Sequence, residues 1–164
     1  MRFLAVASVV AIVTLGGCSK SAQTPPGAPV LKIGPKDGAW SERQALEGPM
    51  AVWGPAELGK EVLSVTCLPS PRRTLVVTLF AAALPSGKPA TGDLTIRADG
   101  QALGVPLSAK EDGAGEARLP VTDALMKRWD GAKGLRFEVK SSPGDGADTG
   151  APSEGLKRVI AACR

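Results

Sequence analysis

The three cysteines offer more chemistry than any other residues of this 164-residue chain. Cys18 ends an apolar run near the N-terminus, whereas Cys67 and Cys163 lie far apart in the remainder of the sequence. The chain contains no histidine and no tyrosine. Serine–histidine–aspartate and cysteine–histidine nucleophiles, histidine-based zinc sites and imidazole acid–base catalysis are therefore excluded.

The segment GPAELGKE, Gly54–Glu61, has the glycine and glycine–lysine spacing of a phosphate-binding loop. It lacks the features on which such a loop depends. Glu61 replaces the hydroxyl that binds magnesium, Pro55 removes one backbone amide, and a strand-like segment follows where a helix is needed. We interpret it as a turn into the next strand and predict no cofactor.

Two acidic, glycine-rich segments have the composition of metal-binding loops. GDGADTG at Gly144–Gly150 contains Asp145 and Asp148, and KEDGAGE spans Lys110–Glu116. A calcium site needs six to eight oxygen ligands, including a strong bidentate carboxylate, which Gly144–Gly150 lacks. We therefore predict solvated turns, with no metal-binding and no catalytic residues. The alternative is a carboxylate-dependent enzyme acting on cell-envelope material, which requires two acidic side chains to converge in a cleft.

The N-terminal segment predicts export. Arg2 provides a positive charge, and Phe3–Leu15 is apolar but shorter than the about 20 residues that span a bilayer. The residues Leu15-Gly16-Gly17-Cys18 then match a lipobox, and in this respect the chain resembles bacterial lipoproteins. That resemblance implies cleavage before Cys18 and attachment of lipid to its sulfur. Acyl chains would anchor the protein to a membrane, since each buried methylene contributes about 0.8 kcal/mol.

The resemblance also implies an address. In Gram-negative lipoproteins a serine after the lipidated cysteine, here Ser19, is compatible with sorting to the outer membrane, so we expect a lipid-anchored protein facing the periplasm. In another type of host it would be a cell-membrane lipoprotein. Nucleic acid is not an expected partner at this location. We assign 1–17 to the signal peptide, 18–38 to the lipidated cysteine and a flexible proline- and glycine-rich linker, and 39–164 to one domain.

Strand-like segments dominate the domain and are separated by proline, glycine and serine turns. In Leu135–Lys140 apolar and charged residues alternate, which predicts an antiparallel strand with one solvated face. Spacing of this kind favours a mainly β domain, a small antiparallel sandwich or a barrel-like sheet. The other predicted strands are Val62–Leu68, Thr74–Phe80 and Asp93–Ala98, with weaker signals at Met50–Trp53, Gln101–Leu107 and Glu116–Leu119.

Two short helices are predicted near 122–130 and 153–163. Thr122 and Ser153 are expected to cap their N-termini, and Gly131 to end the first helix. In the second helix the apolar residues recur at i, i+3, i+4 and i+7, which places Cys163 on the buried face. Along Val62–Leu68, Cys67 shares a face with Leu63 and Val65, so it also points inward if that face is the buried one. We therefore predict one disulfide, Cys67–Cys163, in an oxidising compartment.

Two groups of side chains could bind ligands. Three basic pairs, Arg72-Arg73, Lys127-Arg128 and Lys157-Arg158, could attract anionic lipid or envelope polymers, although acids lie between them in the sequence. The tryptophans Trp40, Trp53 and Trp129 could form a cluster, but are more often core residues.

The order of motifs from WGP at Trp53 to RVIAAC at the C-terminus also resembles a group of small exported proteobacterial β-rich proteins. That similarity implies fold and disulfide only. We predict a non-catalytic binding or envelope-accessory module, with a membrane and an envelope protein or polymer as partners. A structural outer-membrane lipoprotein is a further alternative.

Overall fold

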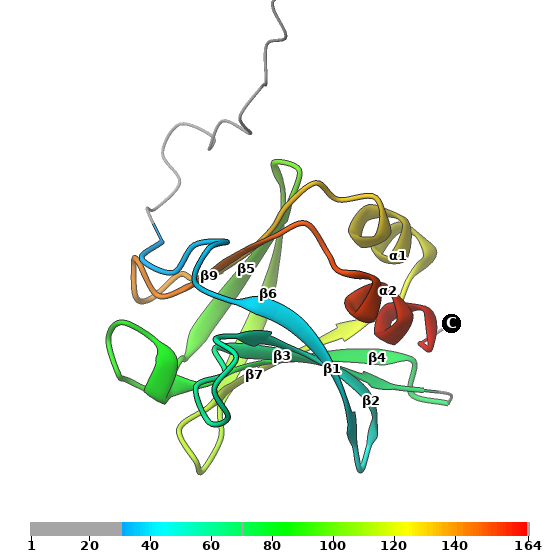
Figure 1. Cartoon of the computed structure of the whole chain (residues 1–164). Coiled ribbons are helices and arrows are strands. Elements are labelled where there is room, and N and C mark those ends of the chain that lie inside the picture. Colours follow the sequence, from blue (N-terminus) through cyan, green and yellow to red (C-terminus); the bar gives the residue numbers. More distant parts are fainter. Residues whose placement is uncertain (1–30, 70, 164) are drawn as a thin grey trace, which may run out of the picture.

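The computed structural model describes residues 31–69 and 71–163, and within these ranges nine strands form one antiparallel sheet (Figure 1). Its strand order is β1-β2-β3-β4-β7-β6-β5-β8-β9, and the sheet curls into a nearly closed barrel. This confirms the predicted mainly β, barrel-like fold. The strands are β1 Ala39–Ala45, β2 Gly48–Gly54, β3 Leu63–Leu68, β4 Thr74–Leu79, β5 Gly92–Ala98, β6 Gln101–Ala109, β7 Gly115–Pro120, β8 Leu135–Val139 and β9 Gly146–Gly150.

The segment before β1 packs against the far edge of the sheet. The Asp148 N–H group in β9 donates a hydrogen bond to the Ile33 carbonyl over 3.0 Å, and Pro35 lies next to Gly150. Residues 31–38 therefore connect the two edge strands and belong to the folded body. They fall within the segment 18–38 that was predicted as a linker, of which residues 18–30 lie outside the described residues.

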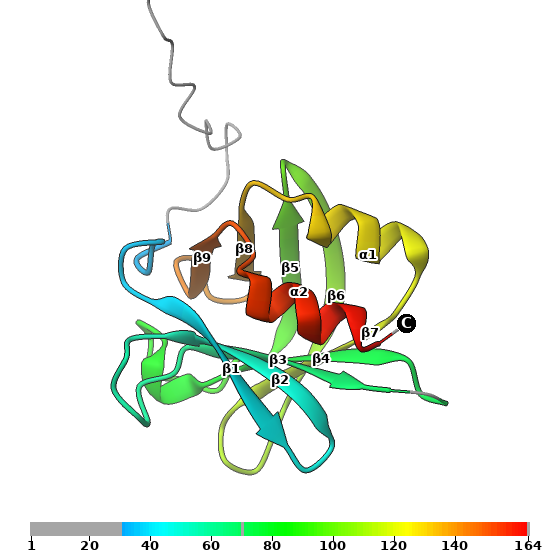
Figure 2. The same ribbon diagram turned by 45° about the vertical axis from the view of Figure 1, so that its right-hand side comes forward.

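Two helices cover one open side of the curled sheet and lie next to each other in both views (Figures 1 and 2). They are α1, Asp123–Asp130, and α2, Glu154–Ala161; a short 3₁₀ turn occupies Ala81–Ala83. The predicted caps are confirmed, because the hydroxyls of Thr122 and Ser153 accept hydrogen bonds from backbone N–H groups three residues later, each over 3.2 Å. No helix in the described ranges has the length and apolarity to cross a bilayer.

The core lies between the inner face of the sheet and the two helices. Leu156, Val159 and Ile160 of α2 are fully buried against β1, β2 and β3, as the apolar stripe predicts. Trp129 of α1 meets Phe137 of β8 edge to face, with ring centroids 6.1 Å apart. Both aromatic side chains are buried, so this pair joins α1 to the sheet.

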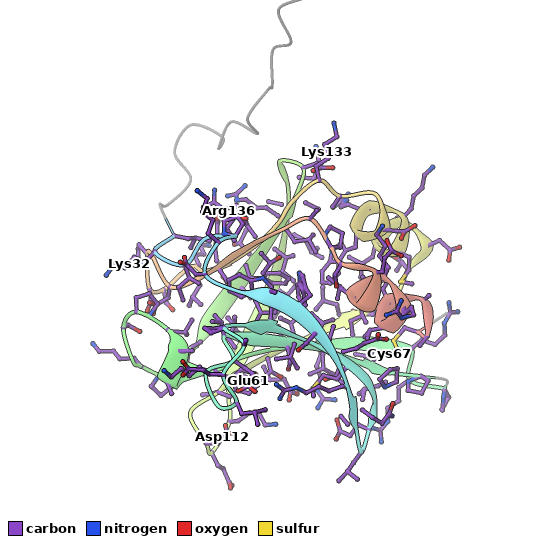
Figure 3. The ribbon with its side chains drawn as sticks, in the orientation of Figure 1. Lys32, Glu61, Cys67, Asp112, Lys133 and Arg136 are labelled. Atoms are coloured by element: carbon purple, nitrogen blue, oxygen red, sulfur yellow. A yellow bond between two sulfur atoms is a disulfide. The ribbon has the colours of Figure 1, made fainter. Side chains whose placement is uncertain are left out.

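Cys67 and Cys163 form the predicted disulfide, with Cα atoms 5.6 Å apart. Both side chains are fully buried. The cross-link ties Cys163, two residues after α2, to the end of β3, and Figure 3 shows Cys67 beside that end of the helix. The C-terminal helix is therefore held on the sheet by a covalent bond as well as by packing.

Two strands were not predicted. Ala39–Ala45 is a largely exposed edge strand without a clear apolar alternation, and Gly146–Gly150 lies inside the segment interpreted as a solvated turn. That interpretation is wrong, since Asp145 is buried and Gly146–Gly150 pairs with β8. Gly146 permits the close approach: its φ is +127°, and a Cβ there would overlap the Phe137 carbonyl oxygen.

Candidate functional site

The sheet is interrupted between β6 and β7, and the interruption forms a hollow of about 450 Å³ that we call the β6–β7 groove. Its floor is apolar because Leu103, which is partly buried, and Val105, which is buried, both line it. Helix α1 begins just after β7 and forms one wall. The lining residues are Leu103, Gly104, Val105, Pro106, Arg118, Leu119, Pro120, Thr122, Ala124, Leu125 and Arg128.

Two prolines explain why β6 and β7 separate. The strands pair from their shared turn only as far as Leu107 of β6. If the register continued, Pro106 would lie opposite Arg118 and Pro120 opposite Gly104. Neither proline has an N–H group to donate, so the carbonyls of Arg118 and Gly104 have no partner across the gap. The sheet therefore opens where the ladder loses both donors.

The open edge of β6 presents regularly spaced backbone groups. The Lys110 N–H group donates to the Ala114 carbonyl over 2.7 Å, across the turn toward β7. Because backbone groups alternate in direction and the β5–β6 register is unbroken, Ala102, Gly104 and Pro106 also direct their polar groups toward β7. In the part of the chain that the structure describes, the ladder between β6 and β7 includes only Leu107, Ser108 and Ala109 of β6, so Ala102 and Gly104 lie beyond it.

The turn before this edge is fixed by its backbone conformation and by one hydrogen bond. Asp99 and Gly100 have φ values of +48° and +82°, as a tight two-residue hairpin requires, and they join β5 to β6. The Asp99 carboxylate accepts a hydrogen bond from the Lys133 N–H group over 2.9 Å, which fixes the turn to the loop before β8. The open edge is thus held on a rigid hairpin.

The rim of the β6–β7 groove is basic. Arg118 is 61% exposed, and its Nε donates to Glu116 Oε1 over 2.8 Å. Arg128 on α1 is exposed and has no ion pair in the part of the chain that the structure describes. An apolar floor, an open strand edge and two guanidinium groups together can accommodate an extended chain that carries a negative charge.

Carboxylates elsewhere in the described residues mainly neutralise or orient other groups. Glu138 of β8, predicted to lie on a solvated face, is instead buried and accepts from Arg97 Nε over 3.0 Å, with Arg136 also 3.2 Å away. Asp145 accepts from the Ser86 N–H group over 3.0 Å. Figure 3 shows the labelled charged residues Lys32, Glu61, Asp112, Lys133 and Arg136 dispersed around the body. No group of three acidic or cysteine side chains suited to a metal ion occurs among the described residues.

The predicted basic pairs serve different local structures. Arg158 of α2 donates through Nε to both carboxylate oxygens of Glu42 on β1, each over 3.1 Å. This hydrogen-bonded pair holds the pKa of Glu42 below its ordinary value. Lys157 pairs with Glu154 over 2.8 Å on the same helix. Arg73 Nε donates to the Cys163 carbonyl over 3.5 Å. Only Arg128 among the pairs' residues lines the β6–β7 groove.

The tryptophans do not form a binding cluster. Trp53 and Trp129 are buried core residues, and Trp40 is partly buried opposite Trp53 in the β1–β2 ladder. The Trp40 indole N–H group is buried and has no hydrogen-bond partner among the described residues. Cys18 lies outside the described residues. The phosphate-loop-like segment after Gly54 forms a loop into β3, with Lys60 paired to Glu57 and Glu61 paired to Arg43.

Comparison with known proteins gives no relative for this chain. No protein-family model matches it, and neither a curated protein nor a solved structure is significantly similar. Any functional assignment therefore depends on the residues and geometry described above.

Sequence reasoning missed the β6–β7 groove. The signal available was a pair of prolines inside two neighbouring strand-like segments, Pro106 in Gln101–Leu107 and Pro120 directly after Glu116–Leu119. Proline inside a strand indicates an unpaired edge or a break in the sheet. Recognising a groove also required the knowledge that these two strands are neighbours.

Proposed function

We propose that the protein is a lipoprotein, anchored to the outer membrane through Cys18, whose β-rich domain is a non-catalytic binding module facing the periplasm. Binding takes place at the β6–β7 groove. The observation that carries this proposal is the groove itself, an apolar hollow beside an unpaired strand edge with arginines at its rim. Such a surface provides contacts for a partner without supplying a nucleophile or a general base.

Two further features support the proposal. The buried disulfide suits an exported protein, because such bonds persist in oxidising compartments. The most buried carboxylates, Glu138 and Asp145, are engaged with Arg97 and with the Ser86 N–H group respectively. These acids stabilise the fold and are poorly placed to exchange protons with a substrate.

The anchor is tested by labelling cells that express the full chain with radioactive palmitate. We expect label in the wild type and in a Ser21→Ala control, and none in Cys18→Ser, which should leave the membrane fraction. Equal labelling of the Cys18→Ser variant, or unchanged fractionation without any label in the wild type, would contradict the proposed anchor. The Cys67–Cys163 disulfide, detected as a mobility shift on reduction, reports that each variant folds.

A further inference from the structure

We infer that the β6–β7 groove binds an extended, acidic peptide segment of a partner protein, which adds as a strand to the open edge of β6. This inference rests on the proposed binding function and specifies the partner's chemistry. Beyond its ladder with β7, the edge of β6 directs the N–H and C=O groups of Ala102 and Gly104 away from β5. A second peptide backbone supplies complementary acceptors and donors at the same spacing.

The backbone groups distinguish a peptide from a lipid. A fatty acyl chain would cover the apolar floor at Leu103, but it would leave the Gly104 N–H and carbonyl groups buried without partners. Such groups cost about 1 to 3 kcal/mol each when they are removed from water unpaired. An extended peptide satisfies them and also places alternate side chains on the floor. The groove, at about 450 Å³, has room for several side chains.

The rim sets the charge of the peptide. Arg118 of β7 and Arg128 of α1 both line the groove. Arg118 already has Glu116 as a partner, whereas Arg128 has no ion pair within the described residues. An aspartate or glutamate side chain, or a C-terminal carboxylate, would accept hydrogen bonds from the Arg128 guanidinium. The Pro106 edge lacks a donor, so pairing is expected to extend along Ala102 to Gly104 and to stop there.

The test uses a phage-displayed library of random 12-residue peptides, selected against the full chain in detergent. We expect the enriched peptides to alternate apolar residues and to contain aspartate or glutamate. Gly104→Pro removes the N–H group at the open edge without removing a bond to β5, and should weaken binding of an enriched peptide about tenfold. Gly104→Ala keeps this N–H group, and its Cβ would meet no atom within 4 Å, so it should bind more tightly than Gly104→Pro.

Charge is tested on α1 without changing the sheet. Arg128→Glu should weaken binding of an acidic peptide about tenfold, whereas Lys127→Glu, an equal charge change outside the groove lining, should have a much smaller effect. In the wild type the peptide should slow hydrogen exchange of the Ala102 and Gly104 amides. A thermal unfolding transition and an intact disulfide confirm folding of each variant.

Three outcomes would overturn the inference. The first is that no peptide is enriched, and the second is that a peptide binds wild type and Gly104→Pro equally while exchange of the Gly104 amide is unchanged. The third is that decanoate displaces the peptide and also binds Gly104→Pro as tightly as wild type. The last result would assign the groove to an acyl chain. Because purified protein is used, these results are independent of palmitate labelling, so failure of the anchor and failure of strand addition can be told apart.

Discussion

Removing the Cys67–Cys163 disulfide should destabilise the domain strongly, and the size of the effect follows from the fold. The two residues are 96 positions apart, so the cross-link closes most of the domain, though not β1 and β2, into one loop. In the chain-entropy description a loop of this length stabilises the folded state by up to about 4.7 kcal/mol, and loss of a native disulfide commonly costs about 2 to 5 kcal/mol. For about 130 ordered residues this corresponds to a fall in Tm of roughly 7 to 18 °C.

The assay is guanidinium-induced unfolding of the double variant Cys67→Ala, Cys163→Ala beside the oxidised and reduced wild type. Reduced wild type keeps both sulfur atoms and loses only the cross-link, so it isolates the effect of the loop. The double variant also leaves a small cavity, since both side chains are fully buried, and should be slightly less stable. The m-value should rise in both, because the unfolded chain can expand.

One result would refute this reasoning. If reduced wild type loses less than about 1 kcal/mol and its m-value is unchanged, the cross-link does not restrict the unfolded chain in the way its 96-residue separation implies. Reductant is expected to act only through opened molecules, because neither sulfur is exposed in the folded state.

Three further predictions concern α2, the β1 edge and the groove. Leu156→Ala, at a fully buried position of α2, should cost about 2 to 5 kcal/mol in chemical unfolding, and a loss below 1 kcal/mol would contradict its core role. The pKa of Glu42 is lowered by Arg158, so the pair stabilises the fold above the unfolded glutamate pKa of about 4.3, and this contribution is lost as pH falls through the lower folded value. In Arg158→Ala an NMR titration should show a raised Glu42 pKa. An unchanged Glu42 pKa would contradict the pairing. Pro106→Val restores an N–H group opposite the Arg118 carbonyl. The added hydrogen bond stabilises the fold by about 0.5 to 1.5 kcal/mol, and the looser unfolded chain costs about 0.4 to 1 kcal/mol, so the two effects nearly cancel in stability. The new amide should nevertheless exchange slowly with solvent, and rapid exchange would contradict the account of the ladder.

Features that depend on local sequence were predicted well. The caps at Thr122 and Ser153 follow from side-chain oxygens that satisfy nearby N–H groups, and this chemistry involves only four successive positions. The disulfide was predicted from the alternation along Val62–Leu68 and from the apolar stripe of the C-terminal segment; both cysteines are buried, although β3 is buried on both faces and Cys163 lies beyond the end of α2. In such cases the periodicity of a single element determines where its side chains lie.

Features that depend on strands distant in sequence were not predictable. Glu138 appeared to lie on a solvated face, but β5 brings Arg97 beside it and the carboxylate is buried in ion pairs. β9 has the composition of a turn, yet it pairs with β8, and Ile33 provides a hydrogen-bond acceptor on its other side. The groove arises because Pro106 and Pro120 fall in neighbouring strands. Each case requires the strand order, which one sequence does not give.

The most direct test of the central claim is site-specific photocrosslinking in intact cells that express the full chain. A photoreactive amino acid at Gly104, on the open edge of β6, is compared with the same group at Leu58, an exposed loop residue outside the groove lining. Binding through the groove predicts an adduct from position 104 that is absent from position 58, and whose digest joins β6 to an extended acidic segment of one partner protein. Equal adducts from both positions, or none from position 104, would contradict it.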